Sequence, residues 1–275
     1  MSHMKNERIC VNGAESEIAV FGRGSRNLII LPGAGDAFRT VKGMALPLSL
    51  MYRKFSPHYR VFFISRRYQM PKGFTTADMA DDIAAIMEKE QLANADVFGV
   101  SQGGMIAQQL ALRYPGKVGR LVLAVTSARM SPMTQEALSA WLLWDTLHNY
   151  ESIMEDTAKR SYTESYLRKN KQMLKIVSRR TKPAEPKRFD AIIRSCLTHD
   201  VLDQLGSIRN PTLVIGAGKD RIVGGEASQQ IAEQIPGSKL IMYDEYSHGV
   251  YDEAADFYDR VLTWLTEPEG SENNA

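Results

Sequence analysis

The chain has little cysteine, no long apolar run and almost no net charge, and each shortage excludes a class of protein. Its two cysteines, Cys10 and Cys196, are too few for a disulfide framework, and their apolar neighbours predict buried thiols. No apolar run approaches the roughly 18 residues that a membrane span needs. The formal net charge of +2 favours neither a nucleic-acid nor a membrane partner. Without a signal-like N-terminus, we expect a cytoplasmic protein.

Motifs for metals and nucleotides are missing as well. The sequence has no His/Cys cluster with metal-ligand spacing, no P-loop and no G-x-G-x-x-G. We therefore predict no metal and no cofactor. Residues 1–4, which include His3, look like a cloning remnant ahead of the natural start. The rest is hydrophobic enough, at 44% over 275 residues, to bury a large core.

Short apolar runs alternate with amphipathic segments over most of the chain. Residues 9–11 and 17–20 flank Asn12-Gly13 and predict an opening hairpin. Strands and helices that alternate at this spacing indicate a parallel sheet covered by helices, an α/β fold. The further predicted strands are residues 28–31, 59–64, 95–98, 118–125, 211–215 and 239–243, and the predicted helices are residues 76–92, 105–114 and 253–265.

One motif carries a specific chemical meaning, the segment Gly99-Val100-Ser101-Gln102-Gly103. It is a G-x-S-x-G pattern between a predicted strand and a predicted helix, which is the setting of a nucleophile elbow. The turn is so tight that only residues such as Gly99 and Gly103 fit two positions either side of the serine. Ser101 is then strained, with its hydroxyl raised above the sheet edge. The alternative is a chance match in a glycine-containing turn, which the strand and helix around it disfavour.

A serine hydroxyl needs a base and an orienting acid, and in this setting both follow it in the chain. Of the five histidines, only His248 follows Ser101 and comes just after a predicted strand. His58 precedes the serine, and His148 and His199 fall in predicted helical stretches. We therefore predict that His248 is the base, the alternative being an ordinary surface-loop histidine.

The orienting acid is predicted from the strand at residues 211–215, which leads into a loop that ends in Asp220. A carboxylate there can reach the imidazole and fix its tautomer. The competing position, the loop at residues 126–129, has no acidic residue. An aspartate at such a place can also be a helix cap or a turn residue. The order Ser101, Asp220, His248 favours the catalytic interpretation.

Two backbone N–H groups are predicted to stabilise an oxyanion beside the serine. Gln102 opens the helix that follows Ser101, where backbone N–H groups stabilise developing negative charge. The second donor belongs in the glycine-rich loop at residues 32–36, after the strand at residues 28–31, and we assign it to the N–H of Ala34. An ordinary glycine-rich turn is the alternative for this loop.

These motifs together resemble the α/β-hydrolase family, and most closely its small capped members that act as serine esterases. The resemblance extends over residues 9–265. It implies an eight-stranded, mostly parallel sheet with helices on both faces. It also implies a triad of Ser101, His248 and Asp220, with oxyanion donors at Ala34 and Gln102.

Two loops depart from the pattern of that family. The loop after the third strand usually begins His-Gly but here begins Pro32-Gly33, so a hydrogen-bonding support for this loop is expected to be missing. The loop after the fourth strand usually reads Asp-x-Arg-Gly, whereas residues 65–68 here read Ser-Arg-Arg-Tyr. The departures weaken assignment to a subfamily and leave the triad untouched.

Between residues 127 and 206 the alternation stops and the pattern becomes helical, with a break at residues 183–186. We predict that this segment is a helical cap inserted into a core of residues 5–126 and 207–266. Caps of this kind close a site and set its specificity. The polar residues 267–275 predict a flexible tail.

Two features of the predicted cap invite functional interpretations. Trp141, Trp144 and His148, with Leu138, have the spacing of one helix face, and they either line an acyl pocket or pack the cap on the core. Residues 159–194 are strongly basic, which is typical of a solvated helix face and also suits docking of an acidic carrier protein. The residues on which we expect such docking to depend are Arg179, Arg180, Lys187 and Arg188.

The sequence favours a serine hydrolase that cleaves a small-molecule carboxylic ester, or a related thioester or lactone, through an acyl-enzyme intermediate. Ser101 argues against the dehalogenases and epoxide hydrolases of this fold, which need a carboxylate nucleophile. An acyltransferase, a carbon–carbon bond hydrolase or a lyase could keep the same three residues. A ligand-binding receptor is a further alternative, because fold alone does not decide function.

Overall fold

The computed structural model describes residues 4–268, so the predicted remnant at residues 1–4 and the predicted tail at residues 267–275 lie mostly outside the described residues. The strands are β1 (Lys5–Val11), β2 (Ala14–Phe21), β3 (Arg26–Leu31), β4 (Tyr59–Ile64), β5 (Ala95–Val100), β6 (Val118–Ala124), β7 (Thr212–Ala217) and β8 (Lys239–Tyr243). The helices are η1 (Ala34–Ala37), α1 (Ala45–Met51), α2 (Thr76–Lys89), α3 (Gln102–Arg113), η2 (Pro115–Lys117), α4 (Pro132–Thr146), α5 (Tyr150–Ser161), α6 (Glu164–Lys169), α7 (Lys171–Arg180), α8 (Pro186–Leu197), η3 (Leu202–Ser207), α9 (Ala227–Gln234), α10 (Val250–Glu253) and α11 (Phe257–Thr266).

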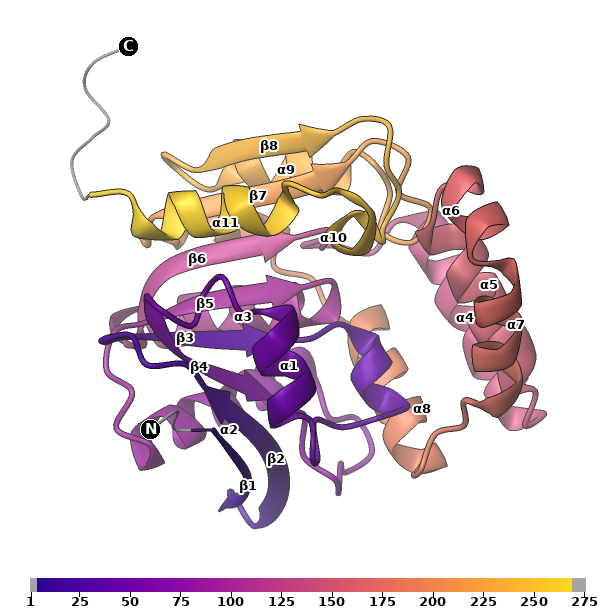
Figure 1. Cartoon of the computed structure of the whole chain (residues 1–275), viewed down its shortest axis with the longest axis horizontal. Helices are drawn as coiled ribbons and strands as arrows, with labels where there is room; N and C mark the ends of the chain where they lie inside the picture. The colour runs from indigo at the N-terminus through magenta and orange to yellow at the C-terminus, as the bar shows by residue number, and fades with distance from the viewer. Residues whose placement is uncertain (1–3, 269–275) are drawn as a thin grey trace.

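The strands of the described chain form one eight-stranded sheet in the order β1-β2-β4-β3-β5-β6-β7-β8. The two pairings that involve β2 are antiparallel, and the pairings from β4 to β8 are all parallel. Helices cover both faces, and the parallel strands all point towards the same side of the molecule (Figure 1). This confirms the predicted α/β fold. It also places the loops after β3, β5, β7 and β8 along one edge.

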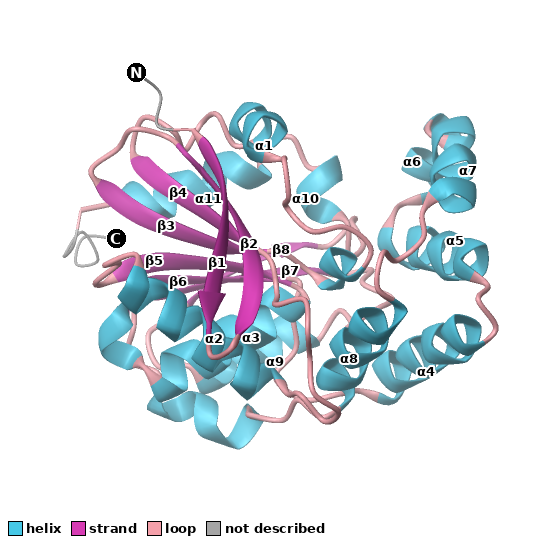
Figure 2. Cartoon of the chain, turned by 90° about the horizontal axis from the view of Figure 1, so that it is seen from below, coloured by secondary structure: helices cyan, strands magenta, loops and turns pink. Residues whose placement is uncertain are grey.

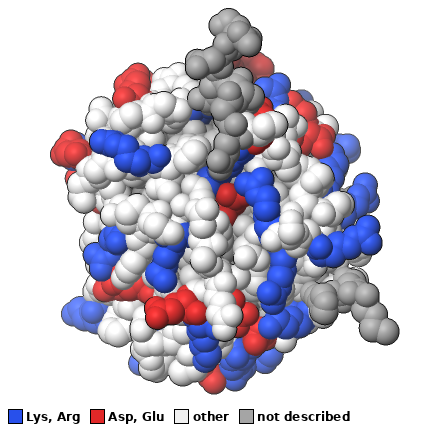
Figure 3. All heavy atoms as spheres, turned by 90° about the vertical axis from the view of Figure 1, so that its left-hand side faces the viewer, with Lys and Arg blue, Asp and Glu red and all other residues white. Residues whose placement is uncertain are grey.

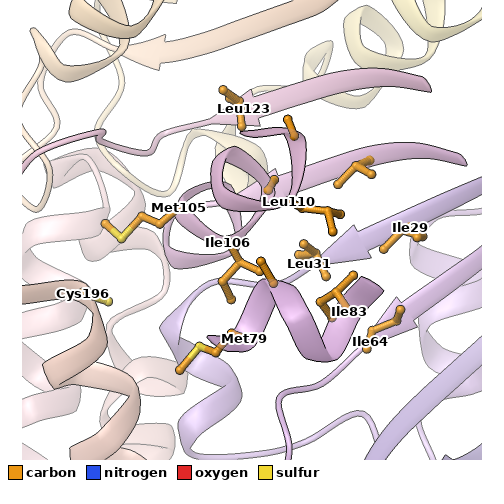
Figure 4. Close-up of a cluster of buried hydrophobic side chains, with 14 of the residues drawn as sticks. Ile29, Leu31, Ile64, Met79, Ile83, Met105, Ile106, Leu110, Leu123 and Cys196 are labelled. Atoms are coloured by element: carbon orange, nitrogen blue, oxygen red, sulfur yellow. The ribbon is translucent and has the colours of Figure 1, made fainter. Parts of the chain in front are cut away.

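Two apolar clusters fill the space between the sheet and its helices. One packs α2, α3 and α9 on one face, and the other packs α1 and α11 on the opposite face. In the first cluster, Leu31 of β3, Ile83 of α2 and Ile106 of α3 point towards one another (Figure 4). The central strand β5 is buried along its whole length, as expected of a parallel strand covered on both sides.

Most predicted elements have the expected type, and their boundaries differ near the site. The helix after the elbow begins at Gln102 rather than at residue 105, with Ser101 at the N-cap position and without a side-chain capping bond. The last predicted helix, residues 253–265, is instead the short α10 followed by α11. The two Ala residues and the Asp that separate them do not continue the helix, so the chain turns there before Phe257.

Helices α4–α7 stand beyond the carboxyl ends of the parallel strands, and α8 lies between them and the sheet (Figures 1 and 2). The predicted break at residues 183–186 falls where α7 has ended at Arg180 and α8 begins at Pro186. Proline is favoured at a first helical position, because its missing N–H would have no partner there. We refer to α4–α7 as the outer lobe.

One of the two cysteines lies in a different environment from the predicted one. Cys196 on α8 is buried, whereas Cys10 is exposed, so the prediction of two buried thiols is wrong for Cys10. Cys10 lies on β1, an edge strand whose last residues alternate between buried and exposed, and the alternation turns Cys10 outwards. Within residues 4–268, no helix has the length and apolar character to cross a membrane.

Asp96, at the start of β5, provides a test of how the fold is held together. It is buried and accepts hydrogen bonds from Arg26 Nη2 at 2.6 Å, from the Tyr59 hydroxyl at 2.8 Å and from the Arg120 backbone N–H at 2.8 Å. Asp96→Ala leaves these donors without the carboxylate. We expect it to lower the free energy of unfolding by about 3 kcal/mol, measured from urea denaturation midpoints.

Asp259→Ala is the matched control, because Asp259 forms an exposed ion pair with Lys54 at 2.6 Å. Such pairs contribute about 0–1 kcal/mol. Equal losses in the two variants would contradict a special role for Asp96.

Candidate active site

Ser101 occupies a sharp turn between β5 and α3. Its φ of 53° lies in the left-handed region, which a residue with a side chain adopts only at a cost. Two of its hydrogen bonds tie it to neighbouring segments. Its N–H donates to the carbonyl of Ala124 at 2.9 Å, and the Thr126 hydroxyl donates to its carbonyl at 2.7 Å. The strained geometry therefore belongs to a turn that is anchored to β6 and to the loop after it.

The glycines on either side make this turn possible. A Cβ atom at Gly99 would lie 2.4 Å from the carbonyl oxygen of Gly103. A Cβ atom at Gly103 would lie 2.0 Å from the carbonyl oxygen of Leu31, at the end of β3. Both distances are far below van der Waals contact, so neither position admits a side chain. The requirement for glycine that the motif predicts is confirmed here as a close backbone approach.

His248 and Asp220 join Ser101 in one hydrogen-bonded chain. The loops after β7 and β8 bring them to the sheet edge where β5 ends. His248 Nδ1 lies 2.8 Å from Asp220 Oδ2, and His248 Nε2 lies 3.0 Å from Ser101 Oγ. With Nδ1–H donating to the carboxylate, Nε2 is left to accept the serine proton. The three residues predicted from separate parts of the sequence are thus brought together.

The carboxylate of Asp220 has all its partners within the protein. Its Oδ1 accepts the backbone N–H groups of Ile222 at 2.8 Å and Val223 at 3.0 Å, while Oδ2 faces the imidazole. The side chains of Asp220 and His248 are only 2% and 6% exposed. Because water barely reaches this pair, the carboxylate holds the ring in one orientation. Ser101, in contrast, is half-buried and faces a cavity.

The two predicted oxyanion donors lie on either side of the serine. Gln102 follows Ser101 directly, and the loop that carries Ala34 passes so close that a Cβ atom at Gly33 would lie 3.3 Å from Ser101 Cβ. Within residues 4–268, the backbone N–H groups of Ala34 and Gln102 have no hydrogen-bond partner. Unpaired N–H groups beside a nucleophile are the arrangement that an oxyanion requires.

The prediction that the oxyanion loop lacks a hydrogen-bonding support is wrong. Arg66, in the loop after β4 whose sequence departs from the family pattern, donates from Nη2 to the carbonyl of Pro32. Its backbone N–H donates to Asp36 Oδ2 at 3.0 Å. A buried guanidinium thus replaces the expected histidine. The unusual residues 65–68 were the signal in the sequence, but a pattern does not show which carbonyl a long side chain reaches.

Ser101 and His248 open onto a cavity of about 810 Å³ between the sheet edge and the outer lobe. Phe38, Met105 and Leu138 are among its apolar lining residues. Trp141 also lines it, and its indole N–H donates to Asp156 at 2.8 Å. The volume lies within the range of ligand sites in proteins.

Two residues predicted to share the acyl pocket do not line this cavity. Trp144 is half-buried and packs against the main core cluster, and His148 is exposed. Trp144 lies within α4 and packs on the core, which is the alternative stated for this helix face. For His148, the prediction assumed one continuous helix face, but α4 ends at Thr146 and His148 follows in a turn with a φ of 54°. The helical phase is lost there, so spacing along the sequence no longer predicts where the side chain of His148 points.

Sequence reasoning missed two tyrosines that line the cavity, Tyr162 and Tyr251. The Tyr162 hydroxyl donates to Asp252 Oδ2 at 2.7 Å, and burial raises the pKa of both phenols, so they stay protonated. Tyr251 lies three residues after His248, which could have drawn attention to it. Tyr162 gives no such signal, because it reaches the site only through the turn between α5 and α6.

Within residues 4–268, no group of three or more His, Cys, Asp or Glu is placed to hold a metal ion. The buried His199 makes its contacts elsewhere: Nδ1 lies 2.9 Å from the Thr76 hydroxyl, and Nε2 lies 3.5 Å from Gln108 Oε1. Burial raises the pKa of the Cys196 thiol to about 12, which makes it a poor nucleophile.

Comparison with known proteins agrees with this geometry. A family model described as the alpha/beta hydrolase fold matches residues 27–255. The chain belongs to the α/β-hydrolase fold family. The predicted resemblance is therefore confirmed over most of the chain.

This α/β hydrolase is 26% identical over 190 residues to a Rhizobium rhizogenes protein named as a carbamate hydrolase, RutD, which covers 68% of this chain and 72% of that one. It is 25% identical over 196 residues to a 2-hydroxymuconate semialdehyde hydrolase of Pseudomonas putida, covering 69% and 68%. The enol-lactonase structure from Burkholderia xenovorans shares the fold, with a TM-score of 0.83 and 18% identity over 95% of this chain and 100% of that one. Family membership and the relatives' names support a hydrolase.

The buried His199 predicts a pH dependence of stability for this α/β hydrolase. Burial lowers its pKa from 6.5 to about 4. The unfolded chain therefore binds the proton at higher pH than the folded one, so this contribution is complete above about pH 6.5 and is lost as the pH falls towards 4. We expect His199→Gln to lose about 2 kcal/mol less stability than the parent between pH 8 and pH 5, measured by urea denaturation at each pH.

The exposed His148 provides the control. His148→Gln is expected to follow the parent at both pH values, because the side chain of His148 is exposed rather than buried. If the free energy of unfolding changed equally with pH in His199→Gln and in the parent, His199 would not be the source of the pH dependence.

Proposed function

We propose that this α/β hydrolase cleaves carboxylic esters, or related thioesters or lactones, through a Ser101 acyl-enzyme. The observation that carries the proposal is the hydrogen-bonded chain from Asp220 through His248 to Ser101, whose hydroxyl faces a large cavity. The free N–H groups of Ala34 and Gln102 beside the serine support it. A pocket that only bound a ligand would not need this alignment.

In the proposed reaction, Ser101 Oγ attacks the carbonyl carbon while His248 Nε2 takes its proton. The carbonyl oxygen becomes an oxyanion held by the N–H groups of Ala34 and Gln102, each contributing about 3 kcal/mol in the transition state. The oxyanion collapses, the acyl–oxygen bond breaks, and the imidazolium gives its proton to the leaving alcohol. Water then attacks the acyl-enzyme with His248 as base, which releases the acid and restores the serine.

Apolar side chains make up most of the cavity near the reacting groups, so we propose an apolar acyl group. Phe38, Met105 and Phe189 contribute from the core side and from α8, and Leu138 and Trp141 contribute from the outer lobe. Burying an acyl chain among them contributes about 0.8 kcal/mol for each CH₂ group. Longer acyl chains are therefore expected to react better until the cavity is full.

Ser101→Ala tests the proposal directly. The parent is expected to react with a fluorophosphonate probe and to hydrolyse p-nitrophenyl esters of rising chain length. Removing the hydroxyl abolishes labelling and lowers kcat by at least about 10⁴-fold, because the nucleophile is lost while the fold is kept. The measurement is probe labelling on a gel together with release of p-nitrophenol.

The panel also contains a lactone and a carbamate, because relatives carry names for those activities. If the lactone or the carbamate is hydrolysed in preference to esters, the protein is still a serine hydrolase but its substrate class is different. Labelling without turnover of any substrate would favour the transferase, lyase or receptor alternatives. A parent that does not react with the probe would overturn the proposal.

The basic segment is arranged differently from the predicted docking surface. Arg188 is 3% exposed and pairs with Asp36, so it is not available to a carrier protein. Arg179 pairs with Glu151 at 3.1 Å, while Arg180 and Lys187 are exposed. A docking site for an acidic carrier protein would therefore rest on fewer cations than the sequence suggests.

Three lysines of the basic segment lie at the cavity instead. Lys159, Lys171 and Lys175 are exposed residues that also line it, and within residues 4–268 no carboxylate pairs with Lys171 or Lys175. Glu155 is the one acidic residue among the described lining. The face at the amino ends of the strands, in contrast, mixes both signs of charge (Figure 3). We propose that the substrate carries a negative charge away from its reacting carbonyl.

The double variant Lys171→Gln/Lys175→Gln tests this charge. We expect kcat/KM to fall about 3- to 10-fold for a p-nitrophenyl half ester of a dicarboxylic acid. The neutral ester of equal chain length is expected to react as in the parent. Steady-state kinetics at low and high salt measure both, and the difference shrinks as salt screens the charges.

Arg180→Gln/Lys182→Gln is the matched control, because both residues are exposed cations outside the cavity. An equal loss in the control would mean that the charge of the whole lobe acts rather than the cavity mouth. A loss seen only with an acyl-carrier-protein substrate would favour the docking hypothesis over a small anionic substrate.

A further inference from the structure

Helix α8 contacts both halves of the proposed oxyanion hole. We propose that Arg188 and the Gln102 side chain are positioning residues that fix the two N–H donors through α8, an inference that rests on the proposed function. The geometry makes α8 part of the catalytic framework, although it lies in the segment expected to form the cap. Neither side chain needs to touch the substrate for this role.

The first half is the loop that carries Ala34. Asp36, two residues after Ala34, is 3% exposed and binds the Arg188 guanidinium twice. Arg188 Nη1 donates to the Asp36 carbonyl, and Nη2 donates to its Oδ2. The same guanidinium donates to the carbonyls of Arg66 at 3.1 Å and Arg67 at 3.2 Å. One side chain of α8 therefore joins the loop after β3 to the loop after β4.

Asp36 has few other partners. Its Oδ1 is buried and has no hydrogen-bond partner within residues 4–268, and the Arg66 backbone N–H is the other donor to Oδ2. The nearest further charge, Arg66 Nη1, lies 3.9 Å from Oδ2. Without Arg188, the buried carboxylate would lose its principal counter-charge, and the loop would have to move to let water reach it.

The second half is the residue after the nucleophile. The Gln102 side chain donates from Nε2 to the Ile192 carbonyl and to the Ser195 hydroxyl, both at 2.9 Å and both on α8. Gln102 is 1% exposed, so these bonds are not shared with solvent. Its backbone N–H is the other proposed donor. Figure 4 shows that Cys196 of this helix lies at the end of the apolar cluster where Met79 of α2 and Met105 of α3 also lie, away from Ile29.

The two tethers lie on one helix, between one and two turns apart. Arg188 lies in the first turn of α8, and Ile192 and Ser195 follow on the side that faces α3. A shift of α8 would therefore displace both donors at once. Oxyanion stabilisation depends on donors within a few tenths of an ångström of the right place. The outer lobe, which does not hold these donors, is free to determine which substrate enters.

The test compares Arg188→Met with Arg194→Met on the same helix, an arginine that is 58% exposed and pairs with Asp190. For Arg188→Met we expect kcat to fall about 10- to 100-fold with KM within about twofold of the parent. Affinity for a trifluoromethyl ketone that mimics the oxyanion should fall by the same factor, while affinity for the product acid should not. Arg194→Met should match the parent.

Two further variants keep the test decisive if Arg188→Met does not fold. Arg188→Lys retains a charge but not the fork of donors, and Gln102→Met removes the side-chain tether while keeping the backbone N–H. Both should show the same fall in kcat and ketone affinity to a smaller extent. Amide hydrogen exchange should rise at residues 33–36 in the Arg188 variants and at residues 102–104 in Gln102→Met.

The outcomes separate the inference from the function beneath it. Variants that lose thermal stability but keep kcat and ketone affinity would reduce α8 to a structural role and overturn the inference alone. A higher KM with an unchanged kcat would also overturn the inference alone. A parent that does not react with fluorophosphonate would overturn the proposed function, and this inference would fall with it.

Discussion

The approach of the Gly103 backbone to the Leu31 carbonyl is the contact on which the site depends. A Cβ atom at Gly103 would lie 2.0 Å from the Leu31 carbonyl oxygen. The first turn of α3 therefore lies directly against the end of β3, and only a hydrogen atom fits between them. Because β3 and β5 are neighbours in the sheet, Ser101 and the loop after β3 share one edge. The order β5-β6-β7-β8 then brings Asp220 and His248 to the same edge from more than 100 residues away.

Buried carboxylates hold the two ends of this sheet. At the amino ends, Asp96 joins β3, β4 and β6 through three hydrogen bonds. At the carboxyl ends, Asp36 joins the loop after β3 to the loop after β4 and to α8. Burying such charges is costly, and their value lies in fixing one geometry among several that apolar packing alone would allow. The contacts of Asp36 adjoin the proposed reaction centre.

The segment between β6 and β7 divides by its contacts rather than by its sequence. Helix α8 and the elbow share direct hydrogen bonds, whereas α5–α7 face the site across the cavity. The end of α5 also reaches the loop of His248, where the Ser161 carbonyl accepts the Gly249 N–H at 2.7 Å. Under the proposed function, α8 belongs with the reaction centre and α5–α7 mainly border the substrate cavity, a division that helical periodicity does not reveal.

Local turn chemistry and strand spacing are enough to predict the fold class, the elbow and the order of the three proposed catalytic residues from the sequence. The sequence did not determine where His148 or Arg188 point, since a single positive φ after α4 changes the phase of a helix face and a long side chain can reach several carbonyls. The support of the loop at residues 32–36, the cavity lining and the proposed role of α8 depend on contacts between segments that no local pattern relates, so only the folded structure gives them.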